Sequence, residues 1–250
     1  MLLDNPRGHY HFLKGIDPYS CGVIADPGYE IVHVVLEDPL PWRQGFERVD
    51  AHLREIGRDR SALCGMELRS PEPFTMQGFI QFNQTYCAVL KEWDLYIGDL
   101  NPVARTNVAP LFDPPAAPVL HGFSCIVPAP AATRPTLVVA GAGEVVRGGA
   151  LKEENILRCG ETSTEAMREK AAYVIDVMEE RLRGLGGTWD LINAVDVYTI
   201  HPLDGLVEDV VLSRLGPAGR HGIRWFKTRP PVRDIEFEMD MRGVRQEVCI

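Results

Sequence analysis

Three segments of the chain repeat apolar residues at intervals of three and four, the spacing that puts side chains on one face of an α-helix. They predict helices over residues 42–56, 77–90 and 163–185. The last begins at a Thr-Ser-Thr-Glu sequence, typical of a capping box, and ends among glycines. We therefore expect three amphipathic helices, each packing one face against the rest of the protein.

Short apolar runs between prolines and glycines indicate strands at 30–37, 135–141 and 191–200. Residues 234–242 alternate strictly between two kinds of side chain, which is the period of a strand. One face is apolar and the other is polar: Ile235, Phe237, Met239 and Met241 against Glu236, Glu238, Asp240 and Arg242. This pattern predicts a half-buried strand whose polar face meets solvent.

A stretch rich in Pro and Ala at 128–135 indicates a boundary, so we predict one domain over 1–130 and another over 131–250. The predicted order of strands and helices is similar on both sides, although the second helix of the C-terminal half, around 203–214, has a weaker pattern. The repeated order predicts an α+β fold made by tandem duplication. Each half would be a mixed sheet with helices packed on one face.

The net charge of −9 disfavours sequence-independent binding to nucleic acid or to anionic lipid. An anionic small molecule would have to be held by local cations. No apolar run approaches the length of a membrane span, so we expect a cytoplasmic protein that does not bind membranes. The six cysteines and seven histidines form neither CxxC nor HExxH spacing, and no metal site is predicted.

Two further motifs give little chemistry. The glycines of VVAGAGEVVRGG, residues 138–149, lack the full dinucleotide-binding pattern and favour a hairpin turn between two strands. The serines form no GxSxG motif, which excludes an α/β-hydrolase of the usual kind. Cys21 is open to two interpretations, a nucleophile or a small buried thiol.

The segment NPVARTNVAP, residues 101–110, carries one long cation on a short, proline-bounded strand. Arg105 is either a solvated charge at a sheet edge or a fixed clamp for a carboxylate. Asn107 would lie on the same face of the strand, because side chains alternate with period two. A planar bidentate donor beside an amide on a rigid element favours the clamp.

Several segments together resemble the reactive intermediate deaminase family (RidA, formerly YjgF-like). GIDPYSCGVI at 15–24 is similar to the opening of that family, GFIQFNQTY at 78–86 to its second helix, and NPVARTNVAP to its late arginine strand. The second half repeats the series, with a long helix, a glycine turn and a strand over 165–200. It ends in IRWFKTRPPVRDIEFEM, residues 223–239. The resemblance spans nearly the whole chain as two copies.

The resemblance implies a chorismate-mutase-like fold, homotrimers with clefts between neighbouring subunits, and no metal or organic cofactor. Family members hydrolyse enamines or imines to carbonyl compounds and ammonia. Two-copy members are similar to the aminomuconate-type deaminases of aromatic-compound degradation, whose substrates are unsaturated dicarboxylates. The small-molecule substrate would then be an enamine dicarboxylate, which calls for more than one cation.

The resemblance also implies roles for particular residues. Arg105 matches the arginine that binds the substrate carboxylate. Glu236 or Glu238 lies near the glutamate that positions water, and of the two we predict Glu236 as the catalytic residue. The first half has His121 where that glutamate is expected, and the intrinsic pKa of histidine suits it to proton transfer. Tyr19, Ser20 and Arg224 match further positions that would bind substrate. Asn107 stands where the family commonly has a cysteine, and we expect it to bind substrate because it shares a strand face with Arg105.

Neither half carries the complete set, so the two halves complement each other across an interface or one half has become structural. Two other functions remain open from the sequence. One is a small-carboxylate-binding protein without catalysis. The other is a hydrolase resembling the chorismatases, which also use two such halves.

Overall fold

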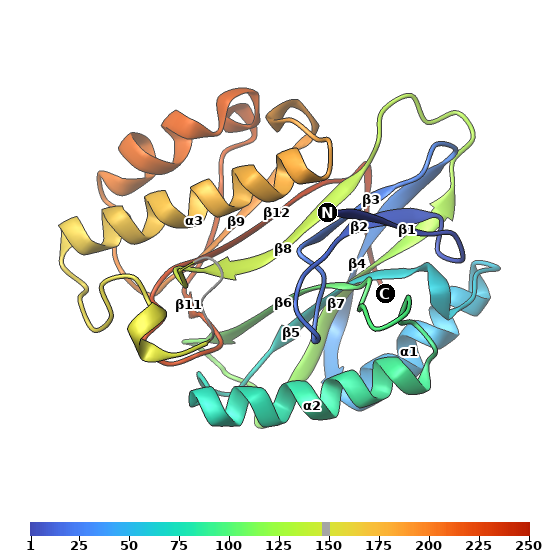
Figure 1. The fold of residues 1–250 in the computed structure, drawn as a ribbon, viewed down its shortest axis with the longest axis horizontal. Helices are drawn as coiled ribbons and strands as arrows, with labels where there is room; N and C mark the ends of the chain where they lie inside the picture. The colour runs from blue at the N-terminus through green and yellow to red at the C-terminus, as the bar shows by residue number, and fades with distance from the viewer. Residues whose placement is uncertain (147–150) are drawn as a thin grey trace.

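The computed structural model describes residues 1–146 and 151–250, which form two mixed β-sheets between layers of helices (Figure 1). The first sheet has the spatial order β11 (Thr228–Arg229), β6 (Ala104–Pro110), β5 (Leu63–Arg69), β7 (Val119–Pro128), β4 (Tyr29–Pro41) and β13 (Gln246–Cys249). The second has the order β1 (Leu2–Asn5), β2 (Tyr10–Leu13), β3 (Gly22–Ala25), β8 (Leu137–Gly143), β12 (Glu238–Gly243), β9 (Ala194–Tyr198) and β10 (Arg224–Phe226).

The three predicted helices are confirmed as α1 (Trp42–Glu55), α2 (Met76–Glu92) and α3 (Thr164–Gly184). Figure 1 shows α1 and α2 below the first sheet and α3 above the second, with the sheets facing each other between them. The apolar face of α1 packs into one core with β4 and β7, and that of α3 into a second core with β8 and β12. Burial of these faces is the main stabilising contribution of the helices.

The duplication is visible in the topology of the two sheets. In the first half the chain runs β4, α1, β5, α2, β6, β7, and the strands lie in the order β4-β7-β5-β6. In the second half it runs β8, α3, β9, short helical turns, β10, β12, and the strands lie in the order β8-β12-β9-β10. Corresponding pairs are antiparallel or parallel in the same way. The α+β prediction, with helices on one face of each mixed sheet, is confirmed.

The predicted boundary near residue 130 falls in the connection between β7 and β8. Sheet membership crosses it at both ends of the chain. Strands β1 to β3 extend the sheet of the second half, and β13 pairs in parallel with β4 of the first half. The division into 1–130 and 131–250 therefore stays a prediction, while the sheets themselves exchange terminal strands.

Two predicted elements differ from those observed. The helix around 203–214 is a π-helical turn, Val207–Val211, followed by 3-10 turns. Gly205 and Gly216 have positive φ on either side, which limits the length of regular helix. The glycine motif at 138–146 forms no hairpin turn, because Gly141 and Gly143 lie inside β8; residues 147–150 of that motif lie outside the described residues.

The polar face of β12, the strand predicted at 234–242, is buried, which corrects the prediction that this face meets solvent. Glu238, Asp240 and Arg242 are each about 95% inaccessible because the first sheet covers them. The strand also starts later than predicted. The backbone N–H groups of Glu236 and Phe237 donate to the Glu144 carboxylate and so pair with a side chain instead of a strand.

Candidate active site

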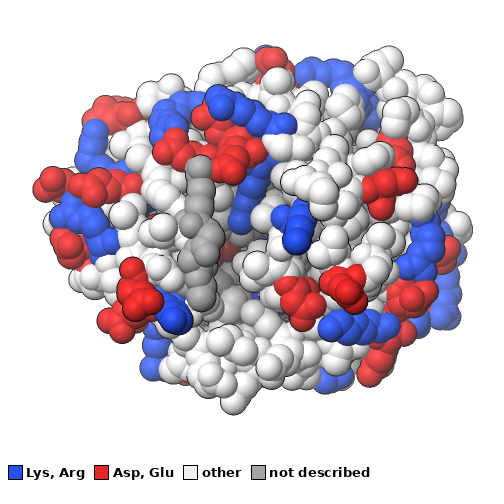
Figure 2. All heavy atoms as spheres, viewed as in Figure 1, with Lys and Arg blue, Asp and Glu red and all other residues white. Residues whose placement is uncertain are grey.

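A cavity of about 750 Å³ lies where the two halves meet. Its walls come from α2 and β6 of the first half, from β8, β12 and α3 of the second, and from residues 16–19 and 21. The volume fits a small organic ligand. Figure 2 shows that the viewed face carries acidic and basic side chains in small mixed groups.

Arg105 on β6 is held rigidly in the wall of this cavity, with 3% of its surface exposed. Its Nη2 donates to Oδ1 of Asn83 on α2 over 2.8 Å. The guanidinium carbon lies 5.2, 5.6 and 4.8 Å from the ring centroids of Tyr19, Phe79 and Tyr86. These cation–π contacts and the hydrogen bond fix the plane of the guanidinium. Nη1 is buried and has no hydrogen-bond partner among the described residues.

Asn107 lies two residues further along β6 on the same face, and it also lines the cavity. Its Oδ1 accepts a hydrogen bond from Ser70 Oγ at 3.0 Å, which orients the amide. Nδ2 then has no acceptor in the described part of the chain. A buried unpaired donor typically costs about 1–3 kcal/mol. Two such donors side by side indicate a place where a ligand supplies the oxygen acceptors.

Glu238 on β12 lines the same cavity from the second half. Burial and the neighbouring Asp240 raise the pKa of Glu238 well above its usual value, while Arg181 and Arg105 act in the opposite direction. The carboxyl lies against Gly141, where an added Cβ would come within 2.3 Å of its Oε1. Gly141 is therefore the residue that makes room for a protonated carboxylic acid in the cavity.

Arg181 on α3 is a second cation in the lining. Its Nη1 donates to the carbonyl oxygens of Ala140 at 2.8 Å and Gly141 at 3.2 Å. These two bonds hold the guanidinium over β8. Burial raises the pKa of Tyr19, although Arg181 and Arg105 both lower it. Tyr19 is thus a neutral phenol near two cations.

The sequence-predicted residues divide into two sets. Arg105, Asn107 and Tyr19 all line the cavity. Arg105 and Asn107 lie on the same face of β6, as strand alternation predicted. Ser20 is adjacent but fully buried, and it does not line the cavity. Its Oγ donates to the carbonyl oxygen of Pro102 and its N–H to that of Val103, so it ties the opening segment to β6.

The other predicted residues lie outside the lining of this cavity. Burial, and after it Arg69, lowers the pKa of His121 on β7 to about 4. Arg224 on β10 donates two hydrogen bonds to Asp196, at 2.6 and 3.0 Å. Glu236 pairs with His201 at 2.7 Å. Of the two glutamates suggested by the resemblance, Glu238 is the one that reaches the cavity.

Sequence reasoning missed two residues of the site. Asn83 lies within the helix segment GFIQFNQTY, where its helical phase relative to Phe79 and Tyr86 was available as a signal. Arg181 belongs to a helix rich in Glu and Arg, and no sequence signal separates it from the solvated charges beside it. Cys21, open to two interpretations from the sequence, is half-buried and lines the cavity.

Among the described residues, one group has the composition of a metal site, namely Asp4, His11 and Asp26. His11 directs Nδ1 to Asp26 at 2.7 Å and Nε2 toward Asp4 at 3.9 Å, so the two carboxylates face opposite nitrogens. None of the three lines the cavity. In the same described part, no helix is both long and apolar enough to cross a membrane.

The fold and the cavity define a duplicated α+β protein with a candidate ligand cavity at the junction of its halves, lined by residues that carry buried, unpartnered cationic and amide donors. The comparisons with known proteins agree with that class and narrow it. The chain belongs to the 2-aminomuconate deaminase CnbZ family, whose family model matches residues 2–248.

A curated relative, the 2-amino-5-chloromuconate deaminase of Comamonas testosteroni, is 42% identical over 244 residues, which is 97% of this chain and 96% of the relative. Solved structures are more distant. A chorismatase covers 97% of this chain and 78% of its own at 13% identity and a TM-score of 0.49. A cyanuric acid hydrolase covers 88% of this chain and 69% of its own at 12% identity and a TM-score of 0.38.

Proposed function

We propose that this protein is a deaminase of the C–N hydrolase class that converts a 2-aminomuconate-type enamine dicarboxylate to the 2-oxo acid and ammonia, as a step in aromatic-compound degradation. The family membership and the 42% identical relative support the reaction. The observation that carries the proposal is the pair of buried, unpartnered donors on β6, Arg105 Nη1 and Asn107 Nδ2, which belong to two residues that line the cavity. A substrate carboxylate satisfies both.

Glu238 is the group suited to move protons in this reaction. In its protonated form it donates a proton to the enamine carbon, and the electron pair of the C=C bond shifts so that the nitrogen becomes an iminium. The Glu238 carboxylate then takes a proton from the water that adds to the iminium carbon. A proton passes from the new hydroxyl to the amine, the C–N bond breaks, and ammonia leaves a carbonyl group.

Arg105 holds the substrate during these steps. Its guanidinium is fixed by Asn83 and by three aromatic rings before substrate enters. Pre-arranged donors stabilise charge without reorganisation at the moment of reaction, which is the largest single contribution in many enzymes. Tyr19, which lines the cavity and contacts Arg105 through its ring, is proposed as a further contact to substrate.

Three expectations from the sequence belong to this proposal as well. The relationship to the RidA family is supported by the duplicated mixed sheets and by the arrangement of Arg105 with a glutamate of the last strand. The homotrimer and the cytoplasmic location follow from the same resemblance. Sedimentation of the purified protein tests the trimer directly.

The function is tested by measuring ammonia and pyruvate released from 2-aminomuconate and from chorismate. We expect ammonia from 2-aminomuconate and no pyruvate from chorismate. Glu238→Gln should lower kcat about a hundredfold or more, because the general acid is lost. In the unsubstituted protein, activity should fall as the pH rises through the raised pKa of Glu238, since the carboxylate cannot donate a proton.

Glu236→Gln is the matched comparison, because it makes the same change two residues away on a side chain that pairs with His201 instead of lining the cavity. It should lose far less activity. Pyruvate release from chorismate, or a full loss in Glu236→Gln with a small loss in Glu238→Gln, would contradict the proposal.

A further inference from the structure

The cavity contains two arginines that enter it from opposite halves of the molecule. Arg105 comes from β6 of the first half and Arg181 from α3 of the second. Both act on the pKa of Glu238 and of Tyr19, so both guanidinium groups lie near the same two side chains. Neither forms an ion pair with a carboxylate of the described residues.

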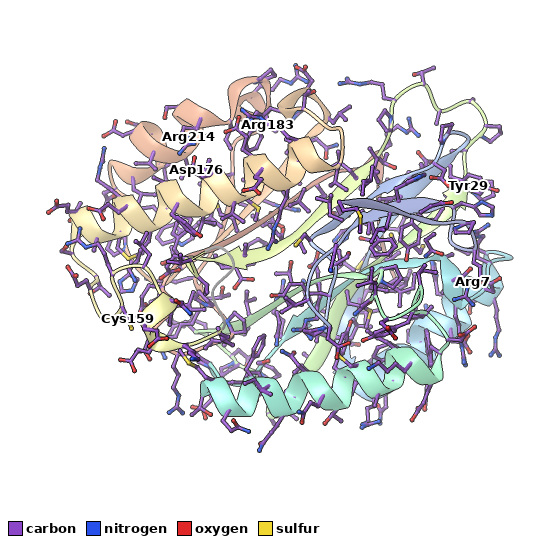
Figure 3. The ribbon with its side chains drawn as sticks, in the orientation of Figure 1. Arg7, Tyr29, Cys159, Asp176, Arg183 and Arg214 are labelled. Carbon is purple, nitrogen blue, oxygen red and sulfur yellow. The ribbon has the colours of Figure 1, made fainter. Side chains whose placement is uncertain are left out.

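Arg181 differs in this respect from the cations around it on α3. Arg183, two residues further on, pairs with Glu179 at 2.6 Å and has 74% of its side chain exposed. Figure 3 shows Arg183 on α3, and beside that helix the turn that carries Arg214, which pairs with Asp176. These charges are balanced within the protein. Arg181 instead binds two backbone carbonyls, which fix its position and leave its positive charge uncompensated.

The remaining charged groups of the lining do not neutralise Arg105 and Arg181 inside the cavity. Asp17 and Glu180 are exposed, and Asp17 lies 3.7 Å from the ammonium of Lys91. Glu238 is buried, and its raised pKa favours the neutral acid. The interior of the cavity thus presents two fixed cations that an anionic ligand can neutralise.

The surface between the charged groups is largely apolar. It includes Cys21, Leu151, Val177 and Ile235, which suit a short hydrocarbon chain better than a polar one. A ligand with one carboxylate would leave one arginine unpaired. A ligand with a carboxylate at each end of an unsaturated chain matches both arginines and the apolar lining together.

We propose that Arg181 binds the second carboxylate of a dicarboxylate substrate while Arg105 binds the first, so that the junction of the two halves selects molecules with two carboxylates. This assignment rests on the proposed function and specifies how its substrate is recognised. Arg181 is a specificity-determining residue, and its carbonyl partners on β8 set where the second carboxylate lies.

The test compares binding of trans,trans-muconate and sorbate by titration calorimetry. Both are unreactive six-carbon dienes without an amino group, and they differ in one carboxylate. The unsubstituted protein should bind muconate about ten- to hundredfold more tightly, the usual effect of one charge-assisted pair. Arg181→Met should bring muconate down to the level of sorbate and leave sorbate within about threefold.

Arg183→Met is the matched control on the same helix and should keep the full preference, because Arg183 faces solvent. Arg181→Lys keeps the charge and should retain part of the preference, which covers the case that Arg181→Met fails to fold. Equal binding of muconate and sorbate by the unsubstituted protein, or a full preference retained in Arg181→Met, would overturn the proposal.

These outcomes are separate from those of the activity assay. A protein that prefers muconate through Arg181 but releases no ammonia from 2-aminomuconate is a dicarboxylate-binding protein, and only the proposed reaction fails. A protein that releases ammonia and shows no dicarboxylate preference keeps the reaction and loses the role of Arg181.

Discussion

The two halves meet in two regions that use the same kinds of side chain with opposite results. In the cavity, Arg105 is 3% exposed and has no carboxylate partner in the described residues. In the second region, Arg242 of β12 is 4% exposed and lies 2.9 Å from Asp196, 3.0 Å from Glu247 and 3.7 Å from Glu67. We call this second region the charge network.

Desolvating an arginine is unfavourable, and the two regions offset it differently. In the charge network the carboxylates of the protein balance the cations. In the cavity aromatic rings and an amide hold Arg105, and the balancing charge is left to the ligand. A buried arginine with protein partners joins the sheets, and one without them forms a binding site.

The largest expected effect is a difference in activity between variants of Arg105 on β6 and of Arg224 on the corresponding strand β10. Arg105→Ala should lower kcat/KM for 2-aminomuconate about a thousandfold, about 4 kcal/mol, because the carboxylate loses its pre-arranged partner. The thermal midpoint should change little, since an unpaired buried cation is removed. Arg224→Ala should lose far less activity, because its partner Asp196 keeps Arg242.

Steady-state kinetics and thermal melts of both variants measure the predicted difference in activity and in stability. Similar losses of kcat/KM in the two variants would remove the distinction between the regions. A large drop in the midpoint of Arg105→Ala would instead make that arginine structural.

A smaller effect is expected on stability from the charge network. Arg242→Met should lower the free energy of unfolding by roughly 3 kcal/mol, the low end for a broken buried pair, because Arg224 still neutralises Asp196. Urea denaturation measures the loss. Arg105→Met is the matched control and should lose much less. Equal stability of the two variants would show that the network contributes nothing beyond its packing.

Much of the fold could be predicted because the apolar pattern along each helix matches the face that the helix buries. The three-four spacing predicted the three helices to within two residues at every end, since each helix packs one face on one sheet. Strand β12 shows what the sequence pattern alone cannot predict. Its polar alternation is typical of a solvated face, and only the first sheet, which the duplication brings over it, makes Glu238, Asp240 and Arg242 buried.

The site could be predicted where it lies within one element and not where it spans the two halves. Strand alternation places Arg105 and Asn107 side by side, and both line the cavity. Alternation also places Glu236 and Glu238 on one face, so it cannot choose between them. The choice depends on Glu144, which draws in the backbone of residue 236, and on Gly141, which makes room for Glu238. The position of Arg181 in the cavity depends wholly on tertiary contacts, so no sequence pattern predicts it.

The smallest expected effect concerns His121, which the sequence put forward as a catalyst and which the structure places outside the cavity lining, beside the charge network. Its pKa is about 4 in the folded protein, against about 6.5 in an unfolded chain. Between these values the unfolded state binds more protons. The stability that neutral His121 contributes is therefore complete above pH 6.5 and is lost as the pH falls toward 4.

His121→Gln removes this titration, so its free energy of unfolding should fall less between pH 7 and pH 5 than that of the unsubstituted protein, by about 2 kcal/mol. Glu67 does not interfere, because its pKa of about 2 places its own loss of stability below pH 4.5. His221→Gln, on the surface, is the control. Activity of His121→Gln at pH 7 should stay within about threefold; a hundredfold loss would return His121 to the catalytic role that the sequence suggested.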